Sequence, residues 1–99
     1  MTTNEVRQAV FSLVKKHDGW SFIPFFKKAW TLKTDIDSDL HFEREEAEAL
    51  MDDFFHQFNV ERGSFSIDTY YPDRHELSQV PDFTLEMLIN SAKEGRWLY

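Results

Sequence analysis

Residues 34–60 of this 99-residue chain read TDIDSDLHFEREEAEALMDDFFHQFNV, and this stretch decides the fold that the sequence predicts. From residue 43 to residue 58, apolar side chains recur at the spacing of one helical stripe. The stripe consists of Ala47, Leu50, Met51, Phe54 and Phe58. Acidic residues occupy the opposite side, and Asn59 ends the pattern. The stretch therefore predicts a short polar lead followed by an acidic amphipathic helix.

Two helices are predicted before this stretch. The first covers residues 4–16, where Thr2 and Glu5 have the spacing of a capping box that starts a helix. A shorter helix is predicted over residues 24–30, because Pro24 suits a first helical turn. Its aromatic neighbours are too apolar for an exposed linker, so we expect this short helix to cover the core.

After the acidic helix, the sequence predicts an extended bridge, a polar loop and a final helix. The bridge covers residues 65–69, where apolar and polar side chains alternate as they do in a strand. The loop covers residues 74–80, and the final helix covers residues 84–93 with Gly95 as its cap. We expect Trp97 to fold back onto the core.

The chain is expected to form a single domain over residues 1–99. A chain of this length buries only about 60–65 % of its unfolded surface, so its core must be efficient. Ten Phe, three Trp and three Tyr supply the bulky apolar area that such a core needs. The predicted core residues are Val10, Leu13, Val14, Leu40, Leu50, Phe54, Phe58, Val60, Phe65, Leu85, Leu88 and Ile89.

The formal net charge of −7 and the sequence pI of about 4.9 limit the classes of partner. Phosphate backbones and anionic membranes repel such a chain, so we expect neither nucleic acid nor a membrane as a partner. A basic protein surface is the natural complement. There is no cysteine, which excludes disulfides and thiol catalysis. The first residues lack the basic and apolar regions of a signal peptide, so we expect a cytoplasmic protein.

The order of these elements resembles that of acyl and peptidyl carrier proteins. Residues 34–40 resemble the polar lead of that family, and the helix that closes on Phe58 resembles its second helix. Aligned without a gap, the family's Asp-Ser-Leu motif falls on Glu43, Arg44 and Glu45, so Arg44 stands where the phosphopantetheine serine would be. The resemblance implies an all-α, acyl-carrier-protein-like bundle of three or four helices with an extended bridge before the last helix.

Three further tracts carry a narrower resemblance: FNV at residues 58–60, FSIDTYYP at 65–72 and MLINSAKEGRW at 87–97. With the polar lead, they resemble a family of small proteins from enteric bacteria, the domain of unknown function number fourteen ninety-three. The resemblance covers residues 32–97, and its final tract is fairly specific. It implies a carrier-like bundle in which acidic residues tend to replace the serine, and it implies no known activity.

Ser38 is the candidate for a covalent modification, because Asp37-Ser38-Asp39-Leu40 resembles the carrier motif shifted along the chain. A carrier serine lies at the mouth of the second helix, whereas Ser38 comes about six positions too early, before Arg44. We therefore interpret Ser38 as a loop serine that bonds local backbone, and keep its modification as the weaker alternative.

The best candidate for a binding surface is the acidic face of the predicted helix. This face consists of Glu45, Glu46, Glu48, Asp52 and Asp53. In carriers the equivalent face docks on basic patches of partner enzymes, so the resemblance implies the same role here, with a solvated helix face as the alternative. Arg44 is interpreted as an exposed residue that pairs with Glu48 one turn later, with a partner contact as its alternative.

The sequence predicts no metal site, no cofactor and no catalytic centre. Glu48, Asp52 and His56 have a spacing that places them on one side of a helix, where they could share a metal ion. No further ligand is in view, so an exposed polar face is the favoured interpretation. The glycine-rich phosphate loop and the nucleophile elbow of hydrolases are missing from the sequence, so we expect no enzyme.

These patterns lead to one hypothesis and two alternatives, and they leave the oligomeric state open. The leading hypothesis is a non-enzymatic protein-interaction module with a carrier-like fold, which docks a basic partner through the acidic face. The first alternative is a functional acyl or peptidyl carrier with a phosphopantetheine arm on a non-standard serine. The second is an antitoxin-like or regulatory inhibitor, which the same acidic surface would serve.

Overall fold

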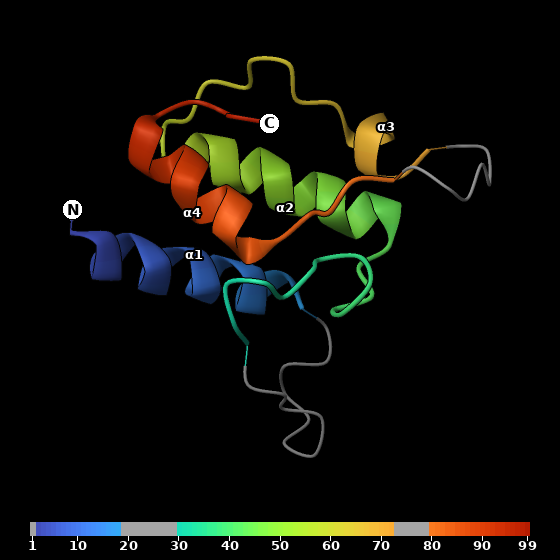
Figure 1. Cartoon of the computed structure of the whole chain (residues 1–99), viewed down its shortest axis with the longest axis horizontal. Helices are drawn as coiled ribbons and strands as arrows, with labels where there is room; N and C mark the ends of the chain where they lie inside the picture. The colour runs from blue at the N-terminus through green and yellow to red at the C-terminus, as the bar shows by residue number, and fades with distance from the viewer. Residues whose placement is uncertain (1, 19–29, 73–79) are drawn as a thin grey trace.

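The computed structural model describes residues 2–18, 30–72 and 80–99, which have an all-α fold. The helices in these ranges are α1 (Thr3–His17), α2 (Arg44–Gln57), α3 (Ile67–Tyr70) and α4 (Leu85–Glu94). Figure 1 shows α1, α2 and α4 around a shared interior, with the short α3 beside the N-terminal end of α2. Helix α1 packs against both α2 and α4, and α3 packs against α2. The predicted all-α class is confirmed.

The helix boundaries follow the signals in the sequence. Thr2 accepts a hydrogen bond from the backbone N–H of Glu5 at 3.2 Å and forms the predicted capping box of α1. Thr84 caps the first turn of α4 through its hydroxyl. Asn59 after α2 (φ 52°) and Gly95 after α4 (φ 78°) adopt the left-handed conformation that ends a helix. The three predicted longer helices are therefore confirmed.

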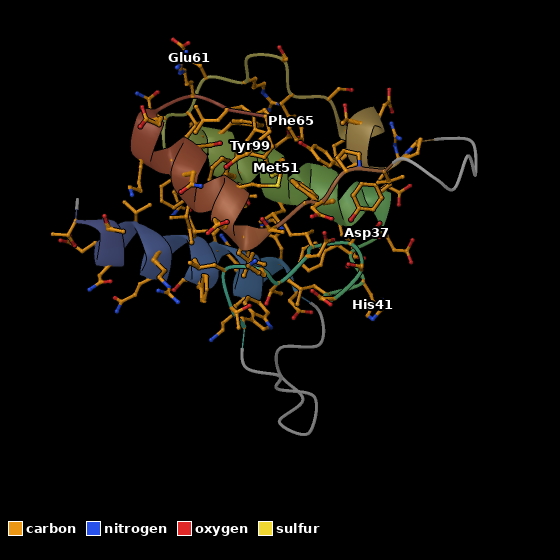
Figure 2. The ribbon with its side chains drawn as sticks, viewed as in Figure 1. Asp37, His41, Met51, Glu61, Phe65 and Tyr99 are labelled. Atoms are coloured by element: carbon orange, nitrogen blue, oxygen red, sulfur yellow. The ribbon has the colours of Figure 1, made fainter. Side chains whose placement is uncertain are left out.

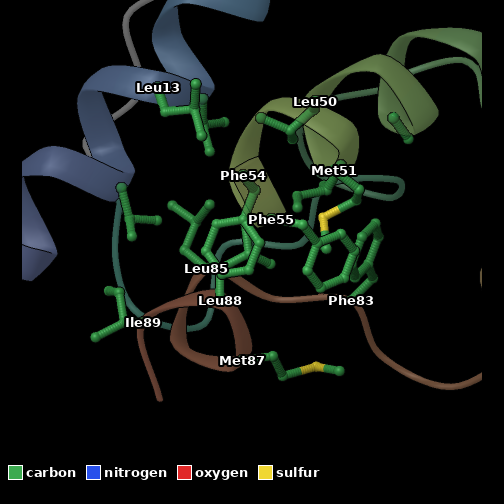
Figure 3. Packing of buried hydrophobic residues seen from close by; sticks show 14 of the residues in the cluster. Leu13, Leu50, Met51, Phe54, Phe55, Phe83, Leu85, Met87, Leu88 and Ile89 are labelled. Atoms are coloured by element: carbon green, nitrogen blue, oxygen red, sulfur yellow. The ribbon is translucent and has the colours of Figure 1, made fainter. Parts of the chain in front are cut away.

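Side chains from the three longer helices meet in one core (Figure 3). Phe54 of α2 and Leu88 of α4 are fully buried there. Most of the predicted core residues are buried, and Leu40, Phe58 and Phe65 pack half-buried against them. Each large apolar side chain that is fully buried stabilises the fold by about 1.5–3 kcal/mol.

The predicted extended bridge is wrong, because residues 67–70 form the helical turn α3. The backbone N–H of Tyr71 donates to the carbonyl of Ile67 at 2.9 Å. An alternation over five residues does not distinguish a strand from a single helical turn. The turn directs Tyr70 into the core, where its ring stacks on that of Phe83 with 4.4 Å between the centroids. Packing of this ring outweighs the strand pattern of the sequence.

An aromatic cluster fills one side of the core, and the sequence predicted only part of it. The cluster consists of Phe55, Phe65, Tyr70, Phe83 and Trp97. Phe83 is 1 % exposed, although it follows a polar segment and belongs to no apolar period. The fold-back of Trp97 is confirmed, since this side chain is buried and meets the ring of Phe65 edge to face at 5.2 Å.

Two predictions fall mainly outside the described residues. The predicted short helix over residues 24–30 lies there except for Trp30, which is half-buried and not helical. The predicted loop over residues 74–80 lies there except for Val80, which is exposed. No helix in the described ranges is long and apolar enough to cross a membrane.

The polar lead before α2 is fastened to the beginning of α4. The backbone N–H groups of Leu85 and Glu86 donate to the carbonyls of Thr34 and Leu32, each at 3.0 Å. These bonds satisfy N–H groups that have no partner within the first turn of a helix. The pairing fixes the loop that precedes α2, and thereby positions the start of α2.

Candidate functional site

Asp35 organises the loop that leads into α2. One carboxylate oxygen, Oδ1, accepts the backbone N–H groups of Asp37 and Ser38 at 2.8 and 3.0 Å. The other oxygen, Oδ2, accepts the backbone N–H of Phe83 at 2.9 Å. Both oxygens therefore bind backbone of this chain, so Asp35 shapes the loop and joins it to the segment before α4.

Ser38 is exposed in this loop and lies outside the first turn of α2. Its backbone N–H is held by the carboxylate of Asp35. Helix α2 begins at Arg44, six positions later in the sequence. Ser38 therefore has the position of a loop residue that the sequence interpretation gave it.

Arg44 lies in the first turn of α2, and its side chain is half-buried. Its Nη1 donates to the carbonyl of Tyr71 at 2.6 Å, and its Nη2 pairs with the carboxylate of Asp68. These contacts tie the start of α2 to α3 and to the residue after it. The predicted partner was Glu48, and helical spacing could not indicate Asp68, which is 24 residues away. Arg44 therefore connects the first turn of α2 to α3.

In the C-terminal half of α2, the carboxylates of the acidic face bond to other parts of the chain. Asp52 pairs with Arg62, with 2.6 Å between Oδ1 and Nη2. Asp53 bonds to His17, with 2.7 Å between Oδ2 and Nε2. Both pairs are partly exposed, so each stabilises the fold by no more than about 1 kcal/mol. They join α2 to the end of α1 and to the loop that follows α2.

The carboxylates near the N-terminal end of α2 form fewer bonds within the chain. Glu46 accepts the backbone N–H of Glu43 at 2.9 Å and so helps to begin the helix. Glu45 and Glu48 are exposed, and neither forms a hydrogen bond or an ion pair in the part of the chain that the structure describes. These two residues, the open carboxylates, are left to water on the outer side of α2.

Several carboxylates make the surroundings of the N-terminal end of α2 strongly negative. Burial raises the pKa of the Tyr71 hydroxyl far above its ordinary value, and the charges of nearby carboxylates raise it further. Those carboxylates belong to Asp37, Asp35, Glu43 and Glu46. Burial, followed by the neighbouring charge of Asp35, also raises the pKa of Asp37. A positive group brought to this end of α2 would therefore meet an attractive potential.

The Asp37→Asn variant is expected to be slightly more stable than the native chain at neutral pH. Because the pKa of Asp37 is raised on folding, the native state binds this proton more tightly, and stability falls as the pH rises through that pKa. The amide removes the penalty, which is roughly a few tenths of a kcal/mol for so exposed a group.

Urea unfolding at neutral pH and below the ordinary pKa of an aspartate measures this effect. The gain should be present only at neutral pH, where the native carboxyl is charged. Glu61→Gln is the control, since Figure 2 places Glu61 far from Asp37. A gain of equal size at both pH values would contradict the assignment of the penalty to the charge of Asp37.

The carboxylate and imidazole groups of α2 are not arranged as a metal site. Among the described residues, no three His, Asp or Glu side chains are placed to hold one ion. Of the three residues considered from the sequence, Asp52 is bonded to Arg62, and Glu48 and His56 are exposed.

Family comparison covers nearly the whole chain. A family model described as Protein of unknown function (DUF1493) matches residues 3–99. The chain belongs to this family. The match confirms the family that residues 32–97 indicated and also covers α1, which added little to that resemblance. A search of curated proteins and a search of solved structures found no match.

Proposed function

We propose that this family member is a non-enzymatic protein-interaction module that docks a basic protein through the first half of α2. The proposal rests on a difference between two groups of carboxylates on the acidic face. Asp52, Asp53 and Glu46 bond within the chain, whereas the open carboxylates stay exposed. Like charges one turn apart repel each other and weaken a helix slightly. The open carboxylates therefore gain most when an opposite charge from another molecule approaches them.

The charge of the whole chain supports the same proposal. The net charge is −7, and the loop before α2 adds Asp35, Asp37 and Asp39 near the end of the helix that carries the open carboxylates. Opposite potentials on two proteins steer their encounter and reject partners of the same sign. The partner is expected to present Lys and Arg side chains. A regulatory inhibitor that covers a basic cleft of an enzyme is one form such a module takes.

The proposal includes an acyl-carrier-protein-like bundle that lacks the chemistry of a carrier. The order of the elements and the polar lead before α2 support this likeness. Arg44, held by Tyr71 and Asp68, stands where the resemblance places the carrier serine. Arginine has no hydroxyl that could accept a phosphopantetheine arm. The bundle would thus present the docking helix of a carrier without its cargo.

Incubation with coenzyme A and a broad-specificity phosphopantetheinyl transferase is expected to leave the mass of the chain unchanged. The reason is that the mouth of α2 offers a guanidinium in place of a hydroxyl. Mass spectrometry of the intact chain makes the measurement, with an authentic carrier protein as the positive control. An increase in mass equal to that of the phosphopantetheine arm, mapped to Ser38, would contradict the proposal and support the carrier alternative.

Co-purification at low salt tests the docking role. The native chain and Glu45→Lys/Glu48→Lys serve as baits side by side. Glu61→Lys/Glu94→Lys, with the same change of charge at exposed positions elsewhere, is the matched control. The proposal is supported if a basic protein binds to the native chain and to the control but not to Glu45→Lys/Glu48→Lys. A protein held equally by all three baits would place the docking surface elsewhere.

A further inference from the structure

The outer side of α1 is basic and aromatic, although the chain as a whole is acidic. An open groove of about 540 Å³ runs along this side. The groove is lined by Asn4, Arg7, Gln8, Phe11, Ser12 and Lys15. Residues 4, 8, 12 and 15 form one row along the helix and residues 7, 11 and 15 form a second, each with steps of three or four positions, so the lining residues share one side of α1. The groove is distinct from the acidic face, which lies on α2.

Two cations lie against two aromatic rings beside this groove. The guanidinium of Arg7 is 5.7 Å from the centroid of Phe11, and the ammonium of Lys15 is 5.7 Å from the centroid of Trp30. The two half-buried rings meet edge to face, with 6.2 Å between their centroids. In the described ranges neither cation forms an ion pair. The groove thus presents two positive charges about 12 Å apart along the helix, with an aromatic ring between them.

The exposed stripe of α2 has the complementary pattern. This stripe consists of Glu45, Glu48, Ala49 and Asp52, all of which are exposed. Glu45 and Asp52 lie about 10 Å apart along the helix axis, close to the spacing of the two cations. The Asp52 carboxylate also pairs with Arg62 of its own chain, and it stays exposed in that pair. Ala49 lies between them and is small enough to accept the ring of Phe11. The two helix surfaces therefore match in charge, in spacing and in the size of their central residues.

We propose that the groove of α1 docks the exposed stripe of α2 from a second copy of this chain. The two surfaces differ, so a single contact of this kind is head-to-tail and leaves one surface of each copy free. Nucleic acid is a poorer occupant, because its phosphates would meet a net charge of −7. Two short helix surfaces make a contact below the standard interface size, and equal net charges oppose it. The association is therefore weak and sensitive to salt.

Self-association of this kind bears on the proposed function, because it uses the open carboxylates. A basic partner and a second copy would compete for Glu45 and Glu48. Assembly would cover the docking surface until the partner binds. The inference depends on the exposure of the stripe and of the groove, and not on the existence of a basic partner.

Sedimentation velocity of the full chain tests the inference. At low salt, the average mass should rise above the 11.8 kDa of one chain as the protein concentration increases, and high salt should abolish the rise. The Arg7→Glu/Lys15→Glu variant should remain monomeric. Lys16→Glu/Lys93→Glu makes the same change of charge at exposed positions outside the groove, and it should still associate.

A mixing experiment then identifies the two surfaces. Arg7→Glu/Lys15→Glu keeps an intact stripe, and Glu45→Lys/Glu48→Lys keeps an intact groove. Each variant should stay monomeric alone, and an equimolar mixture should form a complex. Circular dichroism verifies that both variants keep their helices, as substitutions at exposed positions should.

Three results would overturn the inference. One is a native chain that stays at 11.8 kDa at high concentration and low salt. Another is an Arg7→Glu/Lys15→Glu variant that associates as the native chain does. The third is a mixture of the two variants that stays monomeric. No partner is present in these experiments, so their outcome is separate from that of the co-purification.

Discussion

Replacing Phe83 with alanine is expected to lower the free energy of unfolding by about 3–5 kcal/mol. Phe83 is 1 % exposed, and its ring contacts those of Tyr70, Phe65 and Trp97. Alanine would leave a cavity in the aromatic cluster, and the surrounding rings can collapse into it only in part. The loss is a large share of the roughly 5–15 kcal/mol that stabilises a typical domain.

Urea unfolding followed by circular dichroism measures this loss, at a low temperature that favours the folded variant. Phe83→Leu keeps most of the side-chain volume and should lose only about 1 kcal/mol. Val80→Ala, at a 43 % exposed position in the same segment, is the control and should change little. A loss near that of the control for Phe83→Ala would show that the aromatic cluster does not hold α3 and α4 together.

Reversing the open carboxylates, in Glu45→Lys/Glu48→Lys, is expected to weaken the affinity for the basic partner by roughly tenfold or more at low salt. Two attractive charges become two repulsive ones, and a tenfold change corresponds to about 1.4 kcal/mol. The effect should shrink as salt is added, since exposed charges are screened beyond about 10 Å at 0.1 M ionic strength. Calorimetric titration with the protein recovered by co-purification makes the measurement.

Two control variants separate a docking surface from a general effect of charge. Asp52→Asn/Asp53→Asn removes carboxylates that already bond within the chain, so it should weaken binding less than the reversal does. Glu61→Lys/Glu94→Lys changes the net charge as much as the reversal, and should also weaken binding less. Equal losses in the reversal and in this second control would mean that binding follows net charge alone.

Local signals in the sequence were enough to place the three longer helices. The caps at Thr2 and Thr84 and the left-handed Gly95 involve residues that are close together in the sequence, so the sequence predicted where the first and last helices begin and end. The apolar period of α2 likewise placed Phe54 in the core. These features depend on neighbours within a few positions, which a sequence pattern can reveal.

Contacts between distant residues decided the features that the sequence missed. Arg44 reaches Asp68 across 24 residues, and no periodic pattern links the two. Phe83 belongs to no period, and the burial of Tyr70 turned the predicted bridge into a helical turn. The division of the acidic face has the same origin, because the groups that bond its carboxylates in the C-terminal half of α2 come from α1 and from the loop after α2.

The open carboxylates are the centre of the proposed docking surface, and the rest of the acidic face serves the fold. Backbone amide NMR of the full chain, titrated with the basic protein recovered by co-purification, tests this division most directly. We predict that the largest shift changes fall at residues 44–49, with small changes at Asp52 and Asp53. Changes that are largest on α1 or α4, or that spread evenly along α2, would contradict the proposed surface.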